Sequence, residues 1–372
     1  MKFPAVFSCF VLVLPFVSAS VFTFTARADL TTSSRRADDP AGDDTTSGGD
    51  NDTNAQAVQD TSGTPTNDTS VLSLSLGLTE LLAAFFDQGV SQFTKEDYAS
   101  AGLPSWVYGR YVEMADHEKA HQQSMMAVLD KLGAEKGQVC QYNFTTVDNV
   151  RDFVKLSEAI SEISVSATNG ALRRVKNEDV IGVLASILGN EARHASWINS
   201  AVIGKNPWNT ALETPMTLSQ RFTVVLPLVA SCPESNLPLF PQELKNFATL
   251  KFLDRIVPGQ KTQIDFGSIG SDDGTLLHAA FNVGNGTYIK RVYEQDGGYY
   301  VDLPQELASK GAVFVIIVKD DIQNEGRNGL IVSDANTIAG PSLLMFPFDS
   351  EGNAEPSYDV FKFGDYDAEN VH

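Results

Sequence analysis

Two short stretches, HEKAH at His117–His121 and NEARH at Asn190–His194, both contain the pattern Glu-x-x-His. The first places Glu118 three residues before His121, and the second places Glu191 three residues before His194. Residues three apart on a helix lie on the same face, so each pair can direct a carboxylate and an imidazole at one point in space. The chain has only 5 histidines, and it places two of them in this frame. We therefore expect these two motifs to form a metal site between two helices.

The sequence around the motifs predicts four long helices. They cover residues 71–92, 105–132, 148–175 and 178–203, and the two motifs fall on the second and the fourth. Four helices of this length, joined by modest loops, are typical of a four-helix bundle. In bundles that hold two iron or manganese ions, two helices each supply Glu-x-x-His and the other two each supply one Glu. The alternative is that these Glu and His side chains lie on solvated helix faces.

The remaining ligands of such a site have to come from the first and third helices. The first offers Glu80, which either binds metal or points outward from an otherwise apolar helix. On the third helix, Glu158 and Glu162 stand one turn apart, so either can be the ligand while the other is a solvated acid. Glu113 and His117, also one turn apart, are predicted to be surface groups or partners of the ligands.

The N-terminal part has the composition of a processed, unfolded segment. Residues 1–19 combine a Lys, an apolar run and a small-residue end, which predicts a secretory signal peptide, with a second cleavage option at Ala26–Ala28. Residues 20–70 are acidic and poor in apolar side chains, so we expect a disordered arm or pro-segment. Arg35–Arg36 is either a processing site or a chance pair of surface arginines.

Secretion predicts an oxidising environment for the mature chain. Cys9 leaves with the signal peptide, so Cys140 and Cys232 are expected to pair, the alternative being two buried free thiols. Asn-x-Ser/Thr frames give four candidate glycosylation sites, at Asn51, Asn67, Asn143 and Asn285.

The second half of the chain changes character. Residues 204–250 form a Pro-rich segment, called the connector below, with one short helix expected in LSQRFTVVLPLVA. Residues 251–372 hold short β-prone runs separated by turn residues, which predict a small antiparallel β-sandwich. The fold class is therefore α+β and multidomain. No apolar run after the signal peptide is expected to be long enough to span a bilayer.

Composition and motifs also exclude some functions. The net charge of −20 argues against a nucleic-acid partner, because phosphate binding needs a basic surface. The chain lacks the Gly-x-Ser-x-Gly frame of many hydrolases and the glycine loops that bind phosphate. No catalytic residue is assigned from these patterns.

Several stretches are similar to a known family. They are AAFFDQG on the first helix, DHEKAH on the second, CQYNF before the third, NEARHASWI on the fourth, SCPESNLPL after it and IAGPSLLMFP near the end. Residues 71–240 resemble the ferritin-like domain of secreted fungal proteins described as stress-response or late-sexual-development proteins, which are related to plant desiccation-related proteins. The resemblance implies a ferritin-like bundle, a di-metal centre and a C-terminal β-domain, with ligands that include Glu118, His121, Glu191 and His194.

The chain departs from this family on the first and third helices. Relatives resemble Leu-Glu-x-Leu-Glu before the AAF segment, whereas this chain has Leu78-Thr79-Glu80-Leu81-Leu82. On the third helix, Ser161 stands near the expected acid, with Glu162 beside it. If both acids are lost, the site holds one metal ion or none.

Two functions follow from these observations. One is an extracellular di-metal protein, with iron or manganese, that acts on dioxygen or peroxide; Glu118 and Glu191 would bridge the ions, and His121 and His194 would be terminal ligands. The alternative is a non-enzymatic structural, stress or cell-wall-associated protein in which the same groups form a metal-free buried network. In either case the β-domain is expected to contact cell wall, glycan or another protein. The oligomeric state is left open.

Overall fold

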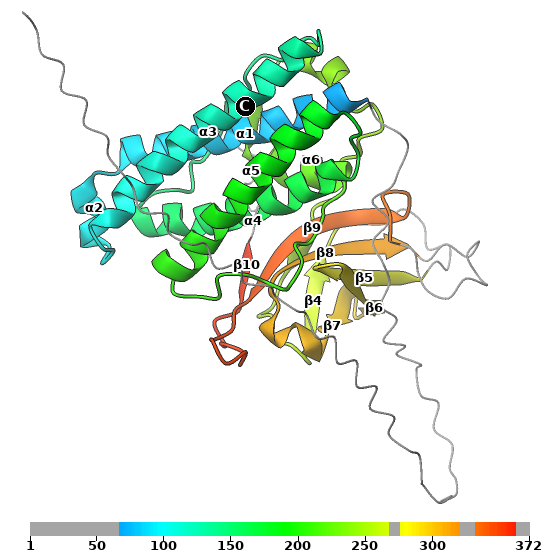
Figure 1. The fold of residues 1–372 in the computed structure, drawn as a ribbon. Helices are drawn as coiled ribbons and strands as arrows, with labels where there is room; N and C mark the ends of the chain where they lie inside the picture. The colour runs from blue at the N-terminus through cyan, green and yellow to red at the C-terminus, as the bar shows by residue number, and fades with distance from the viewer. Residues whose placement is uncertain (1–66, 268–275, 320–331, 362–372) are drawn as a thin grey trace, which may run out of the picture. The chain divides into compact units, whose positions relative to one another are not determined.

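The computed structural model describes residues 67–267, 276–319 and 332–361 (Figure 1). A helical domain comes first and is followed by an antiparallel sheet, so the predicted α+β class is confirmed. The predicted signal peptide, nearly all of the predicted acidic arm and the candidate glycosylation site at Asn51 lie outside the described residues.

The four predicted long helices are present, with a π-helical turn after the last of them. The helices are α1 (Asp68–Gln92), α2 (Lys95–Ser100), α3 (Trp106–Lys131), α4 (Val150–Leu172), α5 (Glu178–Trp197), the π-helical η1 (Ile198–Val202), α6 (Leu218–Val225) and the 3-10 turns η2 (Leu226–Leu228), η3 (Glu234–Leu239) and η4 (Gln305–Ser309). Helix α1 begins three residues before the expected position, because the Asn67 side chain accepts a hydrogen bond of 3.1 Å from the Thr69 backbone N–H and caps the helix.

The long helices pack in pairs, α1 against α3 and α4 against α5, as Figure 1 shows. Aromatic rings fill the space between them: the Phe153 ring of α4 lies 4.9 Å from that of Phe85 on α1 and 4.8 Å from that of Tyr111 on α3. These contacts bury apolar area from three helices at one level, which stabilises the bundle.

Helix α1 differs from one sequence-based expectation. Among the described helices, it is the one whose length and composition would let it cross a bilayer. The prediction that no run of this length follows the signal peptide is therefore wrong. However, 72% of its most apolar window is buried inside the fold. Its apolar character therefore matches that of a helix covered on most sides by the protein itself.

A disulfide bond fastens the connector to the bundle. Cys140, in the loop before α4, is bonded to Cys232, which confirms the predicted pairing. Beside it, β1 (Gln141–Tyr142) pairs with β2 (Val229–Ser231). The predicted short helix of the connector is α6. A disulfide is consistent with an oxidising compartment.

The sheet has eight strands and is nearly barrel-shaped. Its strands are β3 (Lys251–Phe252), β4 (Lys261–Asp265), β5 (Leu277–Val283), β6 (Gly286–Gln295), β7 (Gly298–Asp302), β8 (Gly311–Lys319), β9 (Thr337–Phe346) and β10 (Asp359–Phe361). The spatial order is β10-β9-β8-β5-β6-β7-β4-β3. The sheet differs from the expected sandwich because its two halves are continuous through the long strand β6.

The pairing of β6 explains this continuity. Its first part pairs with β5, from Gly286 opposite Val283 to Arg291 opposite His278, and its second part pairs with β7 from Val292 onward. Residues just before β3 then approach β9, where the Gly340 N–H donates to the Ala248 carbonyl at 2.8 Å. The two ends of the sheet are thus brought near each other.

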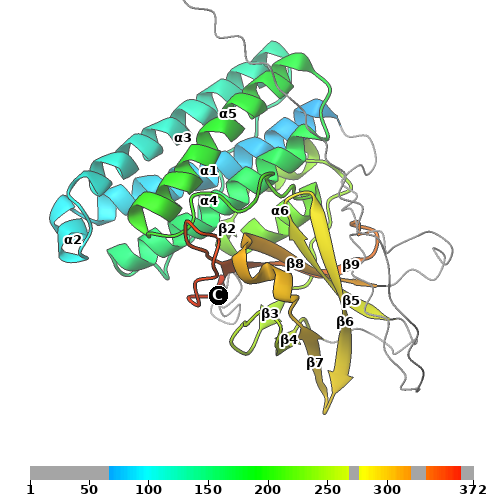
Figure 2. The same ribbon diagram turned by 60° about the horizontal axis from the view of Figure 1, so that its bottom comes forward.

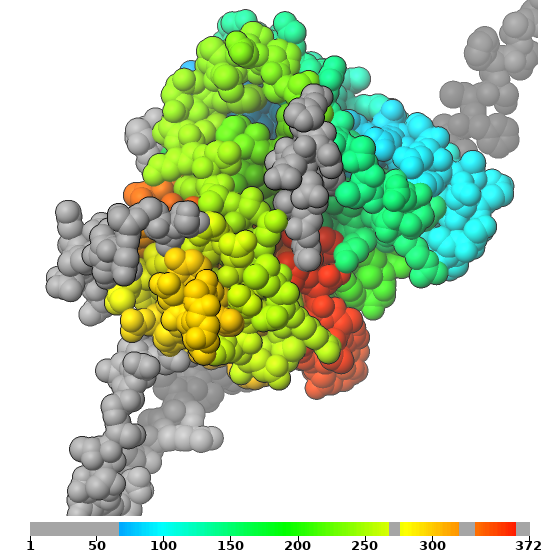
Figure 3. All heavy atoms as spheres, turned by 180° about the vertical axis from the view of Figure 1, so that it is seen from behind, coloured from blue at the N-terminus to red at the C-terminus, as the bar shows by residue number. Residues whose placement is uncertain are grey.

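Strands β8 and β9 are buried on both faces. Val313 and Val315 point into the core of the sheet, whereas Ala312 and Phe314 join the core of the bundle. This accounts for the continuous apolar run of β8, since a strand covered on one face only would alternate with polar residues. Figure 2 shows β8 and β9 beneath the helices. From behind, the red C-terminal segment lies against the helices (Figure 3). Lys155 of α4 and Asp359 of β10 form a 2.8 Å ion pair.

Candidate metal centre

Helices α3 and α5 bring the two Glu-x-x-His motifs together. Each motif spans one helical turn, so its carboxylate and imidazole share a face. Glu118 and Glu191 are fully buried, and His194 is 6% exposed. His121 is the most open of the four, with 12% of its side chain exposed. The two motifs therefore meet as a buried group of two acids and two imidazoles.

The distances within this group suit a single cation. His121 Nδ1 lies 3.4 Å from Glu118 Oε2 and 3.2 Å from Glu191 Oε1. One donor atom from each of these three residues lies within 4.8 Å of the others. Ligands on opposite sides of an ion with bonds of about 2.0–2.2 Å are separated by nearly this distance, so a small contraction would close the site around one ion.

Two unpaired buried atoms support the fit. Glu118 Oε1 and His194 Nδ1 face each other at 3.6 Å, and neither has a hydrogen-bond partner in the described part of the chain. Buried polar atoms are rarely left without a partner, because their desolvation is then uncompensated. A cation between the carboxylate oxygen and an imidazole lone pair would satisfy both, so the residues fit a metal ion.

Electrostatics keeps a proton in the site when no metal is bound. Burial alone lowers the pKa of His121, but its contacts with Glu118 and Glu191 raise that pKa to about 10. Burial and the neighbouring Glu118 carboxylate raise the pKa of Glu191 to about 7. Burial lowers the pKa of His194. The positive charge that the carboxylates attract is therefore supplied by His121, and a metal ion would have to displace its proton.

A family model described as a ferritin-like domain matches residues 67–204, from the cap of α1 to two residues beyond the π-helical turn. Residues 67–204 are a ferritin-like domain. The matched segment contains both Glu-x-x-His motifs and all four long helices. The sheet lies outside the match. No curated protein matched the chain.

Helix α1 of the ferritin-like domain does not bring its predicted acid to the cluster. Glu80 is partly buried, and burial raises its pKa to about 7; the charge of its carboxylate acts on Tyr142. The α1 face toward α3 instead carries Thr79, whose hydroxyl lies 4.0 Å from the Met125 Sδ of α3. The sequence could not decide this orientation, because α1 is apolar on most sides.

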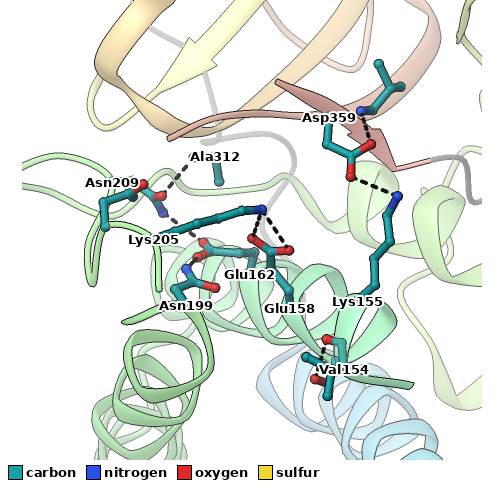
Figure 4. Close-up of polar contacts among 12 residues, drawn as sticks. Val154, Lys155, Glu158, Glu162, Asn199, Lys205, Asn209, Ala312 and Asp359 are labelled. Atoms are coloured by element: carbon teal, nitrogen blue, oxygen red, sulfur yellow. Dashed lines mark hydrogen bonds and ion pairs between the residues drawn. The ribbon is translucent and has the colours of Figure 1, made fainter. Parts of the chain in front are cut away.

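The two acids of α4 are engaged elsewhere, at the junction with the connector and the sheet (Figure 4). Lys205 Nζ lies 2.9 and 3.2 Å from the two Glu158 carboxylate oxygens. Glu162 accepts hydrogen bonds from Asn199 at 2.7 Å and Asn209 at 2.8 Å. Asn209 also accepts from the Ala312 N–H of β8 at 2.7 Å. Neither acid belongs to the Glu118–His121–Glu191 group. We call the contacts of Glu158 with Lys205, and of Glu162 with Asn199 and Asn209, the α4 clamp.

Some of these partners carried no signal in the sequence. Asn199 reaches Glu162 from the π-helical turn η1, and π-helical turns are frequent at functional sites. Lys205 and Asn209 belong to the connector, which was predicted only as a linking segment. Glu113 and His117 were predicted to be surface groups or partners of the ligands. Glu113 pairs with Arg110 on the surface, whereas His117 contacts His194.

The candidate glycosylation sites that can be placed lie at helix caps and turns. The Asn67 amide oxygen caps α1, and that of Asn143 accepts from the Thr145 N–H at 3.0 Å. Asn285, between β5 and β6, accepts from Arg173 at 3.2 Å. In all three, the bond uses the amide oxygen and not the nitrogen to which a glycan would be attached. Glycosylation at these sites stays a prediction.

Proposed function

We propose that the ferritin-like domain binds one iron or manganese ion through Glu118, His121, Glu191 and His194. The observation that carries this proposal is the meeting of three donor atoms within 4.8 Å, with the unpaired Nδ1 of His194 beside them. The expectation of two ions needed acids from α1 and α4. Glu80 lies outside the group and the α4 acids are held in the α4 clamp, so the donors that meet are sufficient for one ion.

The donor set fits the chemistry of these metals. Carboxylate oxygens and imidazole nitrogens suit divalent iron and manganese, and two carboxylates neutralise the charge of one divalent ion. Such an ion supplies one-electron chemistry with dioxygen or hydrogen peroxide. The protein's part is to hold the donors on two rigid helices and to exclude bulk water. The partly open His121 side is the approach for a small oxidant.

The biological setting belongs to the same proposal. The Cys140–Cys232 disulfide supports secretion into an oxidising environment, and the sequence resemblance supports a role in fungal stress response or development. We infer that the sheet, which the ferritin-like match does not cover, provides the contact with cell wall, glycan or another protein.

A second function is favoured by one observation. His121 Nδ1 lies between carboxylate oxygens of Glu118 and Glu191, so the metal-free site already forms a charge-compensated network. Such a network can hold α3 and α5 together without an ion. The protein would then be structural, and the Glu-x-x-His pairs would serve stability alone.

Elemental analysis of the full secreted chain after anaerobic loading with Fe(II) or Mn(II) separates the two functions. We expect about one equivalent of metal in the wild type and none in the His121→Ala/His194→Ala variant. Glu80→Gln is the control, because this acid lies outside the cluster and its loss should leave the metal content unchanged. No metal in the folded wild type would overturn the metal proposal and leave the structural function. Two equivalents, with one lost in Glu80→Gln, would restore the di-metal site.

A further inference from the structure

His117, an exposed residue of α3, reaches over the buried His194 of α5. Its Nδ1 lies 3.0 Å from His194 Nε2, which is a hydrogen-bond distance. The two rings are nearly parallel, with an interplanar angle of 4° and centroids 5.3 Å apart. His117 directly precedes Glu118, so one helical turn carries both the acid that faces His194 Nδ1 and the imidazole that contacts His194 Nε2.

Two neutral imidazoles joined by one such bond share one proton between the facing nitrogens. In one arrangement His194 carries the proton on Nε2 and donates it to His117 Nδ1, which leaves a lone pair on His194 Nδ1. In the reverse arrangement His117 donates, and the proton of His194 sits on Nδ1. Only the first arrangement leaves His194 Nδ1 free to bind a cation beside Glu118.

A bound cation requires the first arrangement, because it takes the lone pair of His194 Nδ1. A proton on His194 Nδ1 would face Glu118 Oε1 at 3.6 Å, which is beyond a normal hydrogen bond. Neither of these atoms has another hydrogen-bond partner among the described residues. His194 is only 6% exposed with His117 in place, so in the folded protein the partner of its Nε2 is His117 and not bulk water. Among the described residues, His117 contacts His194 Nε2 and can fix which nitrogen of His194 is free.

We propose that His117 is a positioning residue that holds His194 in the tautomer with its proton on Nε2, so that the Nδ1 lone pair completes the metal donor set. The inference rests on the proposed metal-binding function. A ligating histidine generally donates its other ring N–H to a partner that fixes the tautomer and ring orientation. Here that partner is a second histidine at the protein surface, one residue from a ligand.

The test combines tautomer and affinity measurements on the full chain. Nitrogen NMR of the histidine rings reports the tautomer of His194 without metal and with Zn(II), a diamagnetic probe. We expect the Nε2–H form in the wild type and a mixture in His117→Ala, with Zn(II) affinity reduced roughly 10- to 100-fold. His117→Gln should recover part of this loss, because its amide oxygen can accept the same proton. Gln123→Ala, an exposed change on the same helix, should have no effect.

The outcomes separate the two proposals. Wild-type binding of Zn(II) with unchanged affinity in His117→Ala, or a wild-type His194 that carries its proton on Nδ1, would overturn the role of His117 alone. Failure of the folded wild type to bind Zn(II), Fe(II) or Mn(II) would overturn the metal site itself. Because His117 is exposed, His117→Ala should retain the helical circular dichroism of the wild type.

Discussion

Glu158 of α4 and Lys205 of the connector form an ion pair in which Lys205 Nζ lies 2.9 Å from Glu158 Oε1. Only 2% of the Glu158 side chain and 14% of the Lys205 side chain are exposed. Glu158 stands at a position on α4 that fits a metal ligand. Its carboxylate instead binds Lys205 and so holds the connector on the bundle. The same holds for Glu162, which links the π-helical turn to the connector.

Loss of the lysine should destabilise the protein strongly. Lys205→Met leaves the Glu158 carboxylate buried without a partner, and we expect a loss of about 3 kcal/mol in the free energy of unfolding. Adding Glu158→Gln should restore part of this loss, because the uncompensated charge is then removed. Urea unfolding of the wild type, both single variants and the double variant measures the coupling. Additive effects of the two changes would show that the pair is not coupled.

The buried Glu162 should make stability depend on pH. Burial raises its pKa to about 7 from the ordinary value of 4.5, despite the hydrogen bonds from Asn209 and Asn199, which act the other way. The folded protein therefore holds this proton more tightly than the unfolded chain, and the free energy of unfolding should fall by about 3 kcal/mol as the pH rises from about 4.5 to 7. Glu162→Gln should flatten this part of the profile, whereas Glu135→Gln, an exposed change, should not. The result that contradicts this account is a wild-type profile that Glu162→Gln leaves unchanged.

Metal binding should strengthen with pH. Because contacts with Glu118 and Glu191 raise the pKa of His121 to about 10, an incoming ion must displace the His121 proton at neutral pH. The apparent affinity should therefore rise about tenfold per pH unit between pH 7.5 and 8.5. Mn(II) titrations at both pH values, with release of protons followed in weak buffer, check this. Equal affinities and no proton release would mean that His121 is neutral before metal binds.

Two helical glycines should respond to alanine in opposite directions. A Cβ at Gly170 of α4 would overlap the Met216 carbonyl oxygen, whereas a Cβ at Gly182 of α5 meets nothing within 4 Å. Gly170→Ala should destabilise by about 3 kcal/mol through overpacking, and Gly182→Ala should stabilise by roughly 0.5–1 kcal/mol through helix propensity. Thermal unfolding of both variants provides the comparison. Similar effects of the two changes would argue against the close approach of α4 to the residues before α6.

Much of the helical domain can be predicted from local sequence. The spacing in HEKAH and NEARH places each acid and imidazole on one helix face, and the apolar periodicity places the four helices within a few residues of their observed bounds. The strands were also predicted, but not their closure into one continuous sheet. That closure depends on the change of pairing partner along β6, from β5 to β7, and on the approach of Ala248 to β9, which are contacts between distant residues.

The sequence by itself determined the two Glu-x-x-His pairs, the helices that carry them and the paired cysteines, because each follows from local periodicity or from composition. Only the tertiary structure decided what the other acids do. Glu158 and Glu162 lie on a helix that is buried on most sides, so periodicity cannot say which face meets the metal and which meets the sheet. Lys205 and Asn209 determine which groups these two acids bind. Both residues are distant in sequence and reach α4 only because the sheet packs against the bundle. The contact of His117 with His194 has the same origin, since it exists only where α3 and α5 pack together.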